Sequence, residues 1–171
     1  MSEPDRIRIV GAGASDLAAV AQLAGVVWRK HYPGIITAAQ IEYMLAHGYS
    51  HPALRRFVTE AGAGLDLARD DERLLGFAAY YRGDDADEIK LEKLYVHPDF
   101  HRQGIGRRLI AATEAAARAQ GRATLVLNVN KNNTQAIHAY LRHGFVMREA
   151  VVVDIGEGFV MDDYIMAKRV P

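Results

Sequence analysis

The residues with the clearest chemical meaning lie near the middle of the chain, in a segment where glycines follow a predicted strand. Gly104 and Gly106 open a predicted helix there, and Arg102 and Arg107 flank them. Glycines let the backbone approach a ligand closely, and the free N–H groups at a helix N-terminus cradle phosphate oxygens. The helix dipole disfavours cations at this end, by about 0.3–1 kcal/mol each when they are exposed. Because an anionic ligand would offset that cost, the segment predicts a phosphate-binding helix start in preference to a solvated turn.

A second segment, 128–145, combines an asparagine-rich turn with a short predicted helix. Asn133 is a natural N-cap for this helix. Ala136 and Tyr140 are four residues apart and therefore share one helical face, where a tyrosine beside a small residue can lie against a ligand. Taken alone, a tyrosine at this position more often packs in the core or on the surface. The segment therefore carries weight only together with the first one.

The elements that must position these segments follow from hydrophobic periodicity, capping residues and turn residues. They predict an α/β fold, with a mixed sheet and helices on its faces. Helices are expected at 15–31, at 37–46, from 50 onward, at 104–120 and at 134–143. Strands are expected at 6–10, 65–68, 74–81, 88–96, 124–129, 145–155 and 159–167. The N-caps predicted for the first three helices are Ser15, Thr37 and Ser50.

The N-terminal segment offers a competing nucleotide-binding motif. Gly11 and Gly13, after a predicted strand, resemble the start of the dinucleotide fingerprint G-x-G-x-x-G. Asp16 replaces the third glycine, and two helices follow where a second parallel strand is needed within about 30 residues. Helix-start chemistry explains these residues better than nucleotide binding does.

Composition and charge exclude several classes of protein. Lys plus Arg and Asp plus Glu number 21 each, so the formal net charge is zero and no general nucleic-acid-binding surface is expected. The absence of cysteine excludes disulfides, thiolate metal sites and a cysteine nucleophile, and the seven histidines show no metal-binding spacing. No apolar run approaches the roughly 20 residues that span a bilayer, and the polar N-terminus is unlike a signal peptide. We expect a cytoplasmic protein without nucleic-acid or membrane partners.

Together, the two segments resemble the GCN5-related N-acetyltransferase (GNAT) superfamily. Gly104 and Gly106 match its acetyl-CoA motif R/Q-x-x-G-x-G/A after the fourth strand. The later motif N-x-x-A-x-x-x-Y, which ends near a Gly-Phe pair, is matched by Asn133, Ala136 and Tyr140. Either motif alone would be a weak signal, but both stand in the right strand and helix contexts. The order of elements also agrees from residue 6 to 168, nearly the whole chain.

The resemblance has one departure and one finer likeness. The family's leading Arg or Gln falls at His101, with Arg102 beside it, so both side chains are candidates for the pyrophosphate. The C-terminal segment 154–168 is similar to bacterial members related to polyamine acetyltransferases. The implied fold is a twisted, mostly antiparallel sheet of about six to seven strands, with helices on both faces and a splay between the fourth and fifth strands. Residues 1–171 are expected to form a single acetyltransferase domain.

The resemblance further implies acetyl-CoA as cosubstrate and no metal. Leu94 and Val96 on the fourth strand would lie beside its pantetheine arm, and Asn133 would contact the same arm. The pyrophosphate would be held by the loop and helix start, that is, by His101, Arg102, Gln103, Gly104, Ile105, Gly106 and Arg107.

Direct transfer to an amine in a ternary complex needs a neutral amine, a stabilised oxyanion and a proton for the leaving thiolate. Glu92 is the candidate base, because alternation along the strand predicts that it shares a face with Leu94 and Val96. An exposed acid paired with a neighbouring lysine is an equal alternative. The Val96 N–H is the candidate oxyanion donor. Tyr140 is the candidate acid, since a tyrosine pKa of about 10 against about 8.5 for a thiol makes proton delivery feasible without strongly driving it.

The acceptor side is less clearly indicated. In the family, the first two helices wall the acceptor pocket. Here those helices carry Trp28, His31, Tyr32 and Tyr43, for which core packing is the better interpretation. The final hairpin would attract a polycation if its acids were exposed, although acids that favour solubility are the better-supported alternative. These acids are Glu157, Asp162 and Asp163.

We therefore expect a small-molecule primary amine, such as a polyamine, as the acceptor. Acetylation of a protein N-terminus or lysine is the alternative enzymatic function, and a non-catalytic acyl-CoA-binding sensor is the alternative outside enzymes. The sequence leaves the oligomeric state open, with a homodimer as one of the states it allows.

Overall fold

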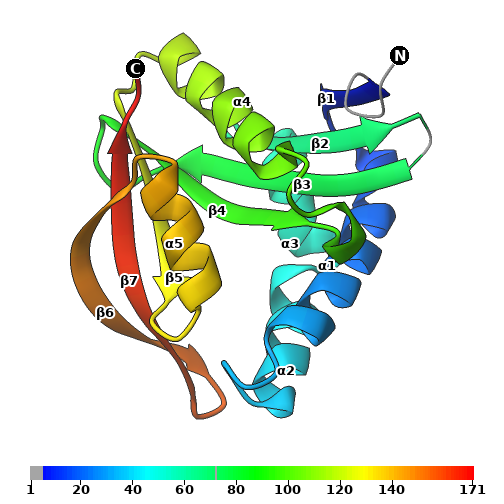
Figure 1. Cartoon of the computed structure of the whole chain (residues 1–171), viewed down its shortest axis with the longest axis vertical. Helices are drawn as coiled ribbons and strands as arrows, with labels where there is room; N and C mark the ends of the chain where they lie inside the picture. The colour runs from blue at the N-terminus through cyan, green and yellow to red at the C-terminus, as the bar shows by residue number, and fades with distance from the viewer. Residues whose placement is uncertain (1–5, 72) are drawn as a thin grey trace.

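A computed structural model of the chain describes residues 6–71 and 73–171. Within them, a seven-stranded sheet has the order β1-β2-β3-β4-β5-β7-β6 (Figure 1). Its strands are β1 Ile7–Gly11, β2 Gly64–Asp70, β3 Arg73–Arg82, β4 Glu88–Val96, β5 Thr124–Asn130, β6 Val146–Gly156 and β7 Phe159–Arg169. Neighbouring strands are antiparallel except β4 and β5, which run parallel. The expected mixed, mostly antiparallel sheet is confirmed.

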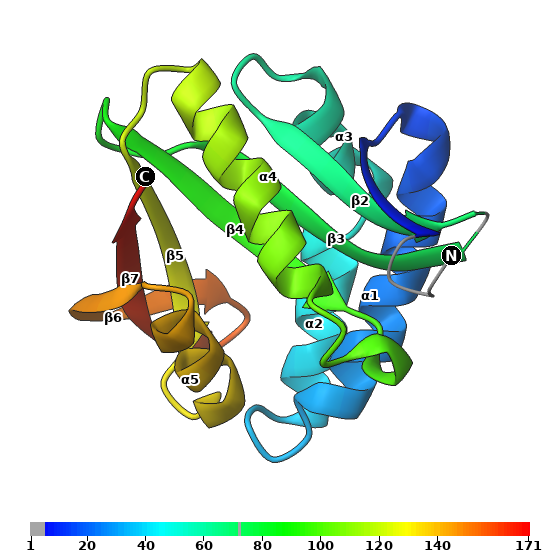
Figure 2. The same ribbon diagram turned by 45° about the horizontal axis from the view of Figure 1, so that its top comes forward.

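Helices cover both faces of this sheet. They are α1 Leu17–His31, α2 Ala38–Gly48, α3 His51–Thr59, α4 Ile105–Ala119 and α5 Thr134–Arg142, with 3-10 turns η2 Ala14–Asp16 and η3 Pro98–Phe100. The apolar sides of α1, α2 and α3 pack on one face, and those of α4 and α5 on the other (Figure 2). Trp28 and Phe77 belong to the first of the two resulting cores, and Leu109 and Phe145 to the second. In the described part of the chain, none of the helices has the length and apolar character needed to cross a membrane.

Capping chemistry sets the starts of α2 and α3. Thr37 Oγ1 accepts a hydrogen bond from the Gln40 N–H at 3.2 Å, and Ser50 Oγ accepts one from the Ala53 N–H at 3.3 Å, as predicted. The Gln40 side chain does not complete the capping box. It donates instead to Val160 O at 2.8 Å, which ties α2 to β7.

The N-terminal turn differs from its prediction. Residues 14–16 form the 3-10 turn η2, and Asp16 rather than Ser15 immediately precedes α1. Asp16 accepts a hydrogen bond from the Gly13 N–H at 2.8 Å and pairs with Arg69 at 2.7 Å, so the turn is fixed to β2. Because β1 pairs antiparallel with β2 after three helices, the segment lacks the parallel strand of a dinucleotide-binding unit, as expected.

The sheet divides where its two parallel strands part. β4 pairs with β5 only over Glu88 to Lys90, opposite Thr124 to Val126. Beyond this point, within the described residues, β4 continues to Val96 beside β3, and β5 continues to Asn130 beside β7. Figure 1 shows the two halves of the sheet turning apart, with α4 over one half and α5 beside the other. This splay confirms the predicted gap and leaves the facing edges of both strands unpaired there.

Candidate active site

The loop between β4 and α4 presents an open backbone surface at the start of the helix. Arg102 and Gly104 adopt left-handed conformations, with φ of 63° and 76°. Gly104 is the N-cap and offers no side-chain cap. A Cβ atom added at Gly104 or Gly106 would meet no other group within 4 Å. The N–H groups of the first turn therefore have room for an anion, and the residues present fit a pyrophosphate.

The side chains at this helix start are of two kinds. Arg102, Gln103 and Arg107 are exposed. Ile105 is 1% exposed and packs in the core beneath α4, so it can offer a ligand only its backbone. The helix start thus has exposed cationic side chains, Arg102 and Arg107, and is fixed to the core by the buried side chain of Ile105.

The end of β4 turns backbone groups toward the splay. The His97 N–H donates to Leu75 O at 2.8 Å, toward β3. Since backbone polar groups alternate in direction along a strand, those of Leu94 and Val96 point the other way, into the gap. His101 Nε2 lies 3.0 Å from Val96 O and hydrogen-bonds at this edge. His101 therefore anchors the loop to the strand.

Glu92 does not share a face with Leu94 and Val96, so that prediction is wrong. The pairing of β3 with β4 shifts register beside Glu92, which is left without a partner residue and forms a bulge. As a result, Leu91 and Leu94 both pack on the α4 side of the sheet. Glu92 accepts a hydrogen bond at 3.2 Å from the hydroxyl of Tyr81, a residue that packs with α1, α2 and α3. The carboxylate therefore lies on the face opposite α4.

Tyr140 is partly buried on α5. Its ring packs against Phe145, with 5.5 Å between the ring centroids. Burial raises the pKa of the Tyr140 hydroxyl, and the nearby Tyr32 raises it further. The phenol therefore remains protonated through the neutral range, where it can donate a hydrogen bond.

Asn133 joins the two sides of the splay. The residue is 5% exposed, and its Oδ1 caps α5 by accepting from the Ala136 N–H at 3.4 Å. The same oxygen lies 2.8 Å from His31 Nε2, so the His31 ring is the donor in this contact. Burial raises the pKa of Tyr32, and a hydrogen bond with Asn133 acts in the opposite direction. The amide is thus held by the end of α1.

Buried hydroxyl groups continue from this point toward α3. Tyr32 Oη lies 3.1 Å from Tyr95 Oη, and Trp28 Nε1 donates to Tyr49 Oη at 3.2 Å. Burial raises the pKa of Tyr49 and of Tyr95 well above the ordinary value. Trp28 and Tyr32 are core residues, as the packing interpretation held. Tyr49 and Tyr95 were missed by sequence reasoning, because tyrosines at a helix end or in a strand resemble ordinary core positions.

The acids of the final hairpin do not form one exposed surface. Asp162 is exposed and pairs with Lys131 at 2.5 Å, whereas Asp163 is 1% exposed. Glu157 lies in the exposed turn between β6 and β7, with a φ of 52°. The Tyr43 hydroxyl donates to a backbone carbonyl of β6 and so docks the hairpin on α2. An attraction for polycations therefore cannot rest on three exposed acids.

Asp163 belongs to a polar row on the face opposite α4. Asn128 Nδ2 donates to Asp163 Oδ2 at 3.4 Å, and Lys90 Nζ donates to Asn128 Oδ1. Burial raises the pKa of Asp163 and lowers that of Lys90. Sequence reasoning missed this row, although a polar residue that interrupts an apolar strand, as Asn128 does, was an available signal. No group of three or more His, Asp or Glu side chains in the described residues could hold a metal ion.

These features agree with the family to which the chain is similar by sequence. The profile of the Acetyltransferase (GNAT) family matches residues 28–145, which include the glycine helix start and the helix that carries Tyr140. Because this match covers more than half of the chain, the chain belongs to the GNAT family and is an N-acetyltransferase. Acetyl-CoA is the cosubstrate of that family.

Individual relatives support the same assignment. The chain is 28% identical over 137 residues to an uncharacterised N-acetyltransferase of Mycobacterium tuberculosis, covering 80% of this chain and 86% of the relative. It is 25% identical over 160 residues to the spermidine N(1)-acetyltransferase of Thermoplasma acidophilum, covering 91% and 96%. The crystal structure of PaiA N-acetyltransferase from Thermoplasma acidophilum, in complex with coenzyme A, matches with a TM-score of 0.81 at 24% identity, covering 95% of this chain and 98% of that one. The predicted fold class is confirmed.

Proposed function

We propose that the protein transfers the acetyl group of acetyl-CoA directly to a primary amine, with small polyamines as the acceptor class. The observation that carries this proposal is the splay between β4 and β5, whose two faces differ in chemistry. On the α4 face it adjoins the open helix start at Gly104 and Gly106. On the opposite face lie Glu92 and the hydrogen-bonded hydroxyls of Tyr32 and Tyr95. Two substrates can therefore meet in one gap from opposite sides, as direct transfer requires.

The α4 face is suited to the cosubstrate, which supplies an activated acyl group as a thioester. The backbone N–H groups of residues 102–107 would hold the pyrophosphate, supplemented by the charges of Arg102 and Arg107 and by the exposed Gln103. The backbone edges of Leu94 and Val96 would bind the pantetheine arm. The Val96 N–H, turned into the splay, would donate to the thioester oxygen as negative charge develops on it.

Asn133 and His101 would act around this arm in different ways. Asn133 would contact the pantetheine at the start of α5, with its amide oriented by His31. His101 would act indirectly, because its ring is occupied by Val96 O and fixes the loop that carries Arg102. Between the two candidates for the family's leading position, this arrangement favours Arg102 for the pyrophosphate.

Glu92 would act as the base on the acceptor side. Free amines have a pKa of about 10 and are protonated at neutral pH, so one proton must leave before the nitrogen can attack. Glu92 would accept that proton, through water, and release it to solvent. Its position opposite α4 supports this role, because the amine would approach the splay from that face.

Tyr140 would assist the leaving sulfur. As the C–N bond forms and the C–S bond breaks, a second proton must pass from the nitrogen to the sulfur. Tyr140 would donate to the developing thiolate and recover a proton from the nitrogen. Since burial raises the pKa of Tyr140 while a thiol has a pKa of about 8.5, full proton transfer from tyrosine is uphill. A hydrogen bond to the developing charge would therefore be the larger part of its contribution.

Two observations support a cationic acceptor. The spermidine N(1)-acetyltransferase of Thermoplasma acidophilum aligns with nearly the whole chain. Glu92 is exposed on the acceptor face, and its negative charge raises the pKa of Tyr81 on the same face, in addition to the larger effect of burial. An ammonium group would find the Glu92 carboxylate there, while the Tyr81 ring is already covered by the Arg56 guanidinium.

A thiol-release assay with acetyl-CoA tests the proposed function. The panel would contain spermidine, spermine, a monoamine of similar length, a peptide with a free N-terminus and a peptide with an internal lysine. We expect the highest kcat/KM with a polyamine. Preference for either peptide would redirect the function to protein acetylation. CoA binding without thiol release from any amine would instead define an acyl-CoA sensor.

A further inference from the structure

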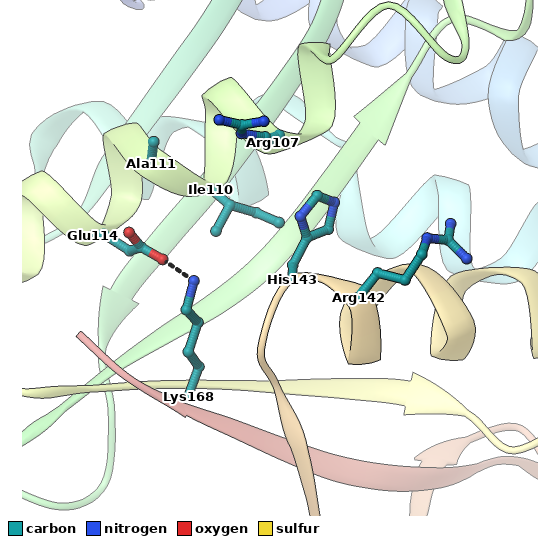
Figure 3. Close-up of a pocket in the computed structure, with 7 residues that line it drawn as sticks. All are labelled: Arg107, Ile110, Ala111, Glu114, Arg142, His143 and Lys168. Carbon is teal, nitrogen blue, oxygen red and sulfur yellow. Dashed lines mark hydrogen bonds and ion pairs between the residues drawn. The ribbon is translucent and has the colours of Figure 1, made fainter. Parts of the chain in front are cut away.

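A groove of about 450 Å³ lies between α4 and the end of α5, on the cosubstrate face (Figure 3). Its lining comes from α4, the end of α5 and the end of β7, and consists of Arg107, Ile110, Ala111, Glu114, Arg142, His143 and Lys168. Figure 3 shows the His143 ring directed toward Ile110 and the Lys168 side chain directed toward Glu114. Arg107 belongs both to the first turn of α4 and to this groove. The groove is therefore continuous with the proposed pyrophosphate site.

The groove carries an excess of positive charge. Lys168 pairs with Glu114 at 2.5 Å, and this pair is neutral overall. Arg107 and Arg142 are exposed, and neither guanidinium has a hydrogen-bond or ion-pair partner among the described residues. Burial lowers the pKa of His143, and the charges of Lys168, Arg142 and Arg107 act in the same direction. Two uncompensated arginine charges thus lie beside a neutral imidazole.

Ordinary structural roles explain only part of this charge. Lys168 is matched by Glu114, and Arg142 lies in the last turn of α5, where the helix dipole favours a cation. Arg107 lies in the first turn of α4, where the dipole disfavours a cation, and beyond the pyrophosphate already proposed there it has no partner of its own among the described residues. An anion bound between the two helices would stabilise Arg107 and Arg142 together.

We propose that this groove binds the 3′-phosphate of coenzyme A. This inference rests on the proposed acetyl-CoA site, and it names a second anionic group of the same ligand. The 3′-phosphate is a phosphomonoester on the ribose whose 5′ oxygen carries the pyrophosphate, so the two groups are separated by one sugar. An α-helix rises about 1.5 Å per residue, which places the groove residues from Arg107 to Glu114 within about 10 Å along the axis of α4. The forked guanidinium groups and the imidazole suit a phosphate through charge-assisted hydrogen bonds.

Titration calorimetry of the full chain with CoA and with 3′-dephospho-CoA, in phosphate-free buffer, tests this inference. We expect the wild type to bind CoA about 10- to 100-fold more tightly, the range of one or two charge-assisted hydrogen bonds. Arg142→Gln should remove most of that preference by weakening CoA binding, and should leave the affinity for 3′-dephospho-CoA unchanged. The matched control is Arg108→Gln, which alters an exposed arginine of α4 outside the groove lining and should keep the wild-type preference. In steady-state kinetics, Arg142→Gln should raise KM for acetyl-CoA without changing kcat.

The outcomes separate this inference from the proposed function. Equal affinity of the wild type for the two ligands would overturn the phosphate groove and leave the acetyl-CoA site intact. A wild-type preference that persists in both Arg142→Gln and His143→Gln would overturn the groove as well, since the phosphate would then bind elsewhere. Failure of the wild type to bind either ligand would overturn the proposed function, and this inference with it. Melting temperatures of the variants verify that each binding change occurs in a folded chain.

Discussion

The proposed role of Tyr140 can be tested by removing a single heavy atom, the oxygen of its hydroxyl group. Tyr140→Phe removes the hydroxyl and leaves the ring packed against Phe145. We expect kcat to fall by about 10- to 1,000-fold, the range for loss of a group that assists proton transfer. KM for acetyl-CoA should change little, because the hydroxyl acts on the leaving sulfur rather than on binding. Steady-state kinetics measure both, with circular dichroism to verify folding. Full activity would assign Tyr140 to packing alone.

Glu92 is tested by the pH dependence of the reaction rather than by its rate at one pH. Glu92→Gln keeps the size of the side chain and removes its ability to accept a proton. We expect activity to be depressed most at low pH, where almost all of the amine is protonated and the reaction depends most on a base. The profile of kcat/KM between about pH 6 and pH 9 measures this. Asp162→Asn, an exposed acid paired with Lys131, is the control. Superimposable profiles for wild type and Glu92→Gln would leave Glu92 as a surface acid.

Among the elements, the first turn of α4 gives the clearest separation of folding from binding. A Cβ at Gly106 meets no neighbouring atom, and an acid at a helix N-terminus is favourable for the helix itself. Gly106→Asp should therefore fold, yet it should abolish CoA binding, because its charge repels the pyrophosphate. Gly106→Ala adds only the methyl group and should retain more of the affinity. Calorimetry with CoA measures the difference, and wild-type affinity in a folded Gly106→Asp would place the anion site elsewhere.

The pairing of α1 with α5 shows how two elements on opposite faces can share one site. His31 at the end of α1 donates to Asn133 at the start of α5, through the splay where β4 and β5 are unpaired. The amide that caps α5 is therefore oriented by a helix that packs on the opposite face of the sheet.

For the molecule as a whole, binding of the cosubstrate should increase the free energy of unfolding and raise the Tm. A ligand that binds only the native state adds about 2.7 kcal/mol at a concentration of 100 times its Kd. For a chain of 171 residues this corresponds to a rise in Tm of about 5–10 °C. Thermal unfolding with acetyl-CoA measures the shift, and NAD is the control, because the described N-terminal residues do not form a dinucleotide-binding unit. A shift with NAD and none with acetyl-CoA would contradict the assignment of the cosubstrate.

Asp163 couples the stability of the molecule to pH. Burial raises its pKa, so the native state binds this proton more tightly than the unfolded chain does. The contribution of Asp163 to the free energy of unfolding should therefore fall as pH rises from the unfolded pKa of about 3.9 through the native pKa. Asp163→Asn removes this titration. Its stability relative to wild type should increase between about pH 4 and pH 7, as measured by urea unfolding. A constant difference across that range would show that Asp163 does not titrate in this way.

The sequence by itself determined what depends on neighbouring residues in the chain. Thr37 and Ser50 cap their helices because a hydroxyl can reach an N–H three residues on. Gly104 and Gly106 mark a helix start whose backbone is left open because these residues carry no side chain. Asn133 marks the start of the next helix. These local features, in their order, were enough to predict the family, the fold and the cosubstrate.

The tertiary structure alone decided which face each candidate occupies. Strict alternation predicted that Glu92 shares a face with Leu94, but the pairing of β4 with β3 introduces a bulge that places Glu92 on the face opposite α4. Asp163 follows an exposed acid in the sequence, yet it is buried beside Asn128 of a neighbouring strand. The physical reason is the same in both cases: bulges and burial arise from pairing and packing between different strands, which the spacing of residues within one strand does not encode.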